Sequence, residues 1–61
     1  LARPLIAFAP YLKRNLAPGG VAVLSGLLVS QEKQVLAAHR THGLYLKKKF
    51  VYQDWCTLVI G

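Results

Sequence analysis

The sequence is poor in cysteine and in long apolar runs, and each shortage excludes a class of protein. A single cysteine, Cys56, permits no internal disulfide, and no group of metal ligands accompanies it, so we expect no metal site. The longest apolar run, residues 21–29, is broken by Ser25 and Gly26 and is far shorter than the ~20 residues of a membrane span. No charged leader opens the chain. We therefore expect a cytoplasmic protein that makes no use of a membrane.

Acidic residues are also scarce. Two stand against eight lysines and arginines, which gives a net charge of +6. This balance permits RNA or an acidic surface as a partner. The basic residues are scattered except for Lys47, Lys48 and Lys49. Alternation along a strand would send these three to opposite faces, and lysines on an outer strand discourage edge-to-edge pairing. We favour that interpretation over a nucleic-acid patch.

The chain is short for its apolar content. It has 61 residues, of which 54% are hydrophobic, and neither a disulfide nor a metal to staple it. A domain of this size buries only about 60% of the surface that its unfolded chain exposes. We therefore expect residues 1–61 to form one piece of a larger domain whose other part covers the apolar faces.

The segment from Leu16 to Leu28 organises the α/β pattern of the sequence. Pro18-Gly19 predicts a type II turn, in which glycine supplies the positive φ. The apolar run of residues 21–24 then predicts a strand covered on both faces, as in the centre of a parallel sheet. Ser25-Gly26 is expected to end this strand. A helix on either side of it would make half of a doubly wound α/β sheet.

The other elements follow from spacing and end signals. Apolar residues three and four apart predict a helix over residues 1–16, which Pro10 should kink or restart, so that its firm part begins at about Phe8 or Pro10. Ser30 is the expected N-cap of a second helix, which Gly43 ends. Residues 44–52 and 55–60 predict two antiparallel strands joined by a tight turn at residues 53–54.

Few side chains indicate chemistry. His39 and His42 could share a metal, but no third ligand is placed to complete the set, and Cys56 suits a buried strand position better than a nucleophile. Tyr11, Tyr45 and Tyr52 lack the spacing of a stacking platform. Ser25 and Gly26 lie where open α/β sheets place ligands, so we expect them to line a substrate cleft. No catalytic residue is assigned.

Three patches carry a family resemblance. In order and spacing, the whole chain resembles the C-terminal end of a class I S-adenosylmethionine-dependent methyltransferase, most closely the bacterial enzymes that methylate ribosomal protein eleven of the large subunit. The patches are Leu1-Ala2 with Pro4-Leu5, Leu16 to Gly20 followed by Leu24-Ser25-Gly26, and Trp55-Cys56 with Gly61.

The resemblance implies a fold and a function. It implies the C-terminal part of a Rossmann-like sheet in which the last strand inserts antiparallel between the other two. It also implies methyl transfer from S-adenosylmethionine to amino groups of a ribosomal protein. The glycine-rich loop and the acidic residue that hold the cofactor in this family precede Leu1. Residues Leu1 and Ala2 would therefore only border the cofactor, and the chain alone should act as scaffold without binding it.

Two further expectations stay open. The alternative function is a small basic binding module for RNA or a protein partner. In the methyltransferase fold, the strand at Val21 to Leu24 pairs with a strand that lies outside these 61 residues. Because an open apolar edge is a template for another strand, we expect the isolated chain to self-associate through Val21 to Leu24.

Overall fold

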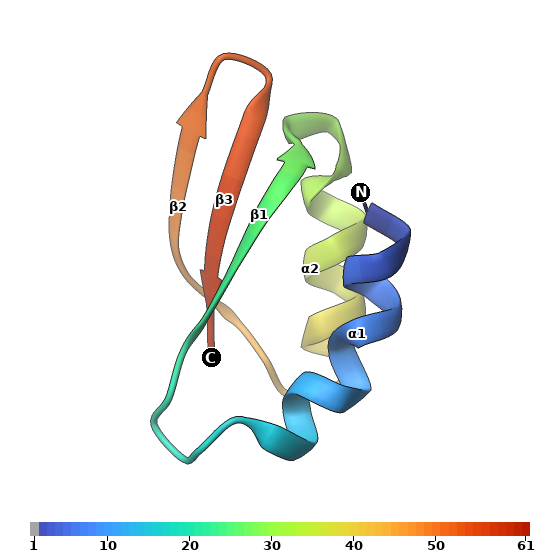
Figure 1. Cartoon of the computed structure of the whole chain (residues 1–61), viewed down its shortest axis with the longest axis vertical. Helices are drawn as coiled ribbons and strands as arrows, with labels where there is room; N and C mark the ends of the chain where they lie inside the picture. Colours follow the sequence, from blue (N-terminus) through green and yellow to red (C-terminus); the bar gives the residue numbers. More distant parts are fainter. Residues whose placement is uncertain (1) are drawn as a thin grey trace.

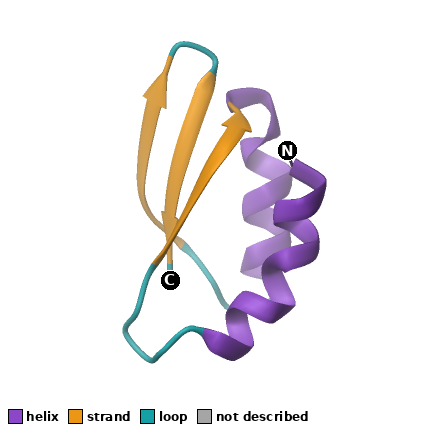
Figure 2. Cartoon of the chain, in the orientation of Figure 1, coloured by secondary structure: helices purple, strands orange, loops and turns teal. Residues whose placement is uncertain are grey.

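The computed structural model describes residues 2–61 as a two-layer α/β unit (Figures 1 and 2). Two helices stand on one side of a three-stranded sheet, which agrees with the α/β class expected from the sequence. The elements are, in order, α1 (Ala2–Asn15), β1 (Ala22–Leu28), the short 3-10 helix η1 (Val29–Gln31), α2 (Glu32–Arg40), β2 (Leu46–Tyr52) and β3 (Trp55–Ile60).

Helix α1 passes through Pro10 without interruption, so the prediction of a restart with a firm part from about Phe8 or Pro10 is wrong. Proline at this position removes one hydrogen bond to the preceding turn. Pro10 itself is exposed, whereas Ala9 and Leu12 beside it are buried. The packing of these buried neighbours against the core compensates for the backbone hydrogen bond that Pro10 cannot donate. Within residues 2–61, no helix is long and apolar enough to cross a membrane.

The turn after α1 confirms the expectation for Pro18-Gly19. The Gly20 amide donates to the Ala17 carbonyl at 2.8 Å, and Gly19 has φ of +77°. Gly20 itself does not have a positive φ. A side chain there would instead place its Cβ 2.9 Å from the Ala17 oxygen. The two glycines are thus required for different reasons, one conformational and one steric.

Strand β1 does not end at Ser25-Gly26, as the sequence suggested, but continues to Leu28. Its register against β3 shifts between Leu24 and Leu27, which is a β-bulge, and Gly26 has φ of +78°. Within residues 2–61, β1 has neither the parallel neighbour nor the cover on both faces that the sequence predicts, and both stay predictions. β1 pairs antiparallel with β3, and Val23 is exposed on the face that the helices leave uncovered.

The last strand lies in the middle of the sheet, as the resemblance implied. The strand order is β1-β3-β2, and β3 runs antiparallel to both neighbours. Strand β3 spans the predicted residues, and the turn at residues 53–54 is confirmed. Strand β2 begins two residues later than predicted, although Tyr45 already exchanges two backbone hydrogen bonds with Gly61, and its register shifts between Leu46 and Lys48.

The entry to helix α2 differs from the prediction. Ser30 lies exposed within η1 and does not cap the helix. Gln31 occupies the cap position, and its side-chain oxygen accepts the Leu28 amide at 2.9 Å. At the other end, Arg40 is the last helical residue and Gly43 has φ of +77°, which confirms the predicted glycine stop.

The core fills the space between the helices and one face of the sheet. Side chains from both α-helices and from β1 and β3 meet there, and Cys56 is buried among them as expected. The largest fully buried apolar residues are Leu27, Leu58, Ile60 and Val35. Since strand residues alternate between faces, the neighbours of these buried residues on β1 and β3 point to the side without helices.

The turn at Gly19 gives a stability test. Replacing Gly19 with valine should lower the free energy of unfolding by about 1–2 kcal/mol, because a β-branched residue at positive φ is strained. Asparagine, which tolerates this region, is the matched control and should cost less. Chemical denaturation measures both. Equal stability of the valine variant and the parent chain would contradict the assigned turn.

Candidate functional site

An open groove of about 840 Å³ lies beside the start of α1. Ala2 belongs to its wall, together with residues of η1 and α2. The complete lining is Ala2, Arg3, Pro4, Ala7, Gln31 and Gln34. Ala2 is itself buried, so it contributes shape more than contact surface. Leu1, the other residue expected to border a cofactor, lies outside the described residues.

Ser25 and Gly26 form the bulge of β1 and are both exposed. Neither lines the groove at α1, and a Cβ built on Gly26 meets nothing within 4 Å. The structure therefore places the two predicted cleft residues in the middle of the strand, two residues before its carboxyl end. Their role in binding a substrate stays a prediction.

The residues around the groove do not by themselves make a site for S-adenosylmethionine. The ribose hydroxyls of such a ligand call for an acidic partner, as in dinucleotide-binding folds. The chain has two acidic residues, Glu32 and Asp54, and neither lines the groove. Glu32 is paired with Lys49, and Asp54 lies in the turn between β2 and β3. No acidic side chain of residues 2–61 therefore lines the groove to bind ribose hydroxyls.

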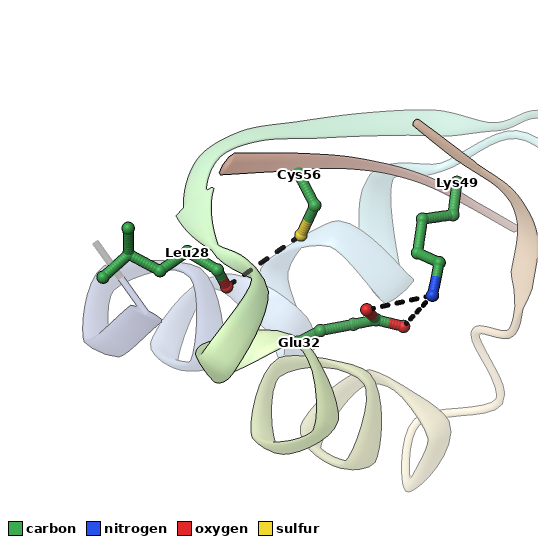
Figure 3. Close-up of polar contacts among 4 residues, drawn as sticks. All are labelled: Leu28, Glu32, Lys49 and Cys56. Carbon is green, nitrogen blue, oxygen red and sulfur yellow. Dashed lines mark hydrogen bonds and ion pairs between the residues drawn. The ribbon is translucent and has the colours of Figure 1, made fainter. Parts of the chain in front are cut away.

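Cys56 lies next to an ion pair between α2 and β2 (Figure 3). The Lys49 ammonium contacts the Glu32 carboxylate at 3.1 Å, and the Cys56 thiol donates to the Leu28 carbonyl at 4.0 Å. Burial, reinforced by the negative charge of Glu32 and opposed by Lys49, raises the pKa of this thiol above its ordinary value of 9.0. A thiol that resists ionisation is a poor nucleophile, in agreement with the predicted structural role.

The two histidines are not brought together as metal ligands. His39 is fully buried, and its Nδ1 donates to the Val35 carbonyl at 2.8 Å within the same helix. His42 follows α2 in the turn before Gly43. Among residues 2–61 there is no group of three side chains that could hold a metal ion.

The sequence analysis missed a cluster of aromatic side chains on the face of the sheet opposite the helices. Phe50 and Tyr52 lie on β2, and Trp55 lies on β3 directly opposite Tyr52. All three are exposed. The spacing of the three tyrosines does not reveal this cluster, and no spacing along the chain shows that Tyr52 and Trp55 are partners. The tight turn at residues 53–54 was the one signal that could have indicated the pair.

The buried environment of Cys56 predicts slow alkylation of its thiol and a loss of stability at alkaline pH. Because the pKa of the folded thiol is raised, the folded chain keeps a proton that the unfolded chain loses, so the free energy of unfolding falls as the pH rises past about 9. Iodoacetamide should alkylate the folded chain more than tenfold more slowly than the urea-unfolded chain. A Cys56→Ala variant should lack this part of the pH dependence. Equal alkylation rates in the folded and unfolded chains would contradict the assignment.

Comparison with known proteins identifies the family. The family model for ribosomal protein L11 methyltransferase (PrmA) matches residues 1–61. Proteins of that name from Brucella suis and Agrobacterium fabrum are each 48% identical to this chain over 58 residues, which is 95% of the chain. The same match covers 20% of each relative, so the chain spans about a fifth of the length of these relatives. The chain belongs to the ribosomal protein L11 methyltransferase family.

Proposed function

We propose that this chain is the C-terminal scaffold segment of a protein methyltransferase that transfers methyl groups from S-adenosylmethionine to amino groups of ribosomal protein L11. The observation that carries the proposal is the match to the family over the whole of residues 1–61. The substrate follows from the name that the relatives bear. A ribosomal protein substrate also favours the cytoplasm as the place of action.

The part played by this segment is positional. The cofactor supplies an electrophilic methyl group, and the rate depends on holding an amine in line with the bond that breaks. The start of α1 and the residues after β1 form one wall of a groove at the end of the sheet where α/β folds place ligands. In this proposal the chain fixes that wall, and the residues that bind the cofactor lie upstream.

The larger sheet of the proposed enzyme is Rossmann-like, with β1 in its interior. Strand β1 is an edge strand of the sheet in residues 2–61, because β3 is its one neighbour there. Val21 and Val23 are exposed beside that edge. An upstream strand that paired with β1, and upstream helices over the uncovered face, would bury these valines. In this proposal residues 1–61 form a single C-terminal fragment of the methyltransferase domain, as expected from the sequence.

Cofactor binding tests the proposed division of labour. The complete polypeptide that contains residues 1–61 should transfer methyl groups to ribosomal protein L11 and bind S-adenosylmethionine. Residues 1–61 alone should bind none, since they provide one wall of the groove. Isothermal calorimetry compares the two proteins. Saturable micromolar binding by the short chain would contradict the scaffold role, and no methyl transfer by the complete polypeptide would contradict the function.

The edge of β1 predicts the behaviour of the short chain alone. Its unpaired backbone groups and the exposed Val23 should pair two copies about a two-fold axis. Replacing Val23 with lysine should shift the chain from dimer to monomer in sedimentation experiments. Val51→Lys, at an exposed position of β2, is the matched control and should leave the dimer intact. A monomeric parent chain at high concentration would rule out this association.

A further inference from the structure

The side chain of Gln31 links the end of β1 to the start of α2. Gln31 is the last residue of η1 and occupies the cap position of α2. Its Oε1 accepts the backbone amide of Leu28, three residues earlier, at 2.9 Å. A glutamine that reaches back to such an amide forms one half of a capping box. The bond is partly buried, and both of its partners belong to residues 2–61, so no group outside them is needed to make it.

The Leu28 amide points to the edge of β1 that faces away from β3. Leu28 is extended, with φ of −78° and ψ of 150°, and the next amide, that of Val29, donates to the Asp54 carbonyl at 2.8 Å. Successive amides of an extended segment point to opposite sides, so the Leu28 amide is on the side without β3. Among the described residues β3 is the one neighbour of β1. Gln31 therefore occupies the donor at which pairing along this edge would otherwise continue.

The same segment forms one wall of the groove beside α1. Gln31 and Gln34 are the lining residues that η1 and α2 contribute, and the others belong to α1. Two hydrogen bonds attach this wall to the sheet, one from the Leu28 amide to Gln31 and one from the Val29 amide to Asp54. Loss of the Gln31 oxygen would leave the second bond alone to hold the segment between β1 and α2.

We propose that Gln31 is a positioning residue for the acceptor protein in the proposed methyl transfer. It acts through the Leu28 amide, which its Oε1 holds, and so keeps this wall of the groove in one conformation. The inference rests on the proposed function, in which the residues that bind S-adenosylmethionine lie upstream and this wall shapes the site of the amine. A wall that is ordered before binding spares the acceptor protein the entropic cost of ordering it.

Two other roles of Gln31 make different demands on its side chain. Direct contact with an acceptor atom of a ligand would use Nε2, which donates, whereas positioning uses Oε1, which accepts. Gln31→Glu keeps an oxygen acceptor without an N–H, and its charge suits the start of α2. Gln31→Met removes the oxygen at similar length. Gln34→Met is the matched control, because it changes the lining of the groove and leaves the bond to Leu28 intact.

Steady-state kinetics with ribosomal protein L11 and the complete polypeptide that contains residues 1–61 test the role. Gln31→Met should raise the KM for L11 about 3- to 10-fold, because a loosened wall must be ordered on binding, and should leave the KM for S-adenosylmethionine within about twofold. Gln31→Glu and Gln34→Met should both keep the KM values of the parent polypeptide. A smaller folded fraction lowers kcat alone, so a loss of stability does not imitate the expected rise in KM.

Hydrogen exchange in the same polypeptides tests the contact without methyl transfer. The Leu28 amide should exchange slowly in the parent and in Gln31→Glu, and about tenfold faster in Gln31→Met. The Val29 amide donates to Asp54 and should stay slow in every variant, which shows that each one is folded. Equally slow exchange of the Leu28 amide in Gln31→Met would overturn the proposal, since a group other than Gln31 would then hold that amide.

Failure of the inference and failure of the proposed function are separate results. An active parent with the same KM for L11 as Gln31→Met would overturn the positioning role and leave the proposed function intact. A raised KM in Gln31→Glu would also overturn it, because Nε2 would then be the required atom, and so would an equal rise in Gln34→Met. No methyl transfer by the parent would overturn the proposed function and the positioning role with it.

Discussion

Strand β3 holds the other two strands in place, because each of them hydrogen-bonds to β3 and to no other strand of the described chain. Its alternate residues Cys56, Leu58 and Ile60 are buried, so the same strand also carries the centre of the core. The last seven residues of the chain therefore decide both the hydrogen bonding of the sheet and the packing of the helices against it. A chain that lost them would keep two helices and two strands with no partner for either strand.

Local sequence signals predicted the features that depend on a few neighbouring residues. Pro18-Gly19 fixed a turn because proline and glycine restrict the backbone there, and Gly43 marked the end of α2 for the same reason. Features decided by distant contacts were predicted less well. Pro10 stays inside α1 because burial on either side outweighs one lost bond. Ser25-Gly26 stays inside β1 because pairing with β3 continues across the bulge.

The predictions about the candidate site also succeeded where they depended on neighbouring residues and failed where they depended on distant contacts. The patches that resemble methyltransferases are continuous in sequence, so they could be recognised without a structure, and the family is confirmed. The location of Ser25 and Gly26 relative to the groove depends on where β1 ends, and this was misjudged. The cluster of Phe50, Tyr52 and Trp55 depends on which residue of β2 faces Trp55. The turn between the two strands sets that register, and composition does not show it.

The bulge at Lys47 separates the two ends of β2. Leu46 pairs with Ile60 and Lys48 with Val59, so Lys47 is one residue in excess of regular pairing. Removing it would restore unbroken alternation, with Leu46 and everything from Lys48 onwards keeping the partners and the faces that they have now. The hairpin can therefore vary by one residue in length at this position without turning the rings of Phe50 and Tyr52 toward the core. In a regular strand, the loss of one residue would turn the side chains on one side of it to the opposite face of the sheet, and at this bulge it does not.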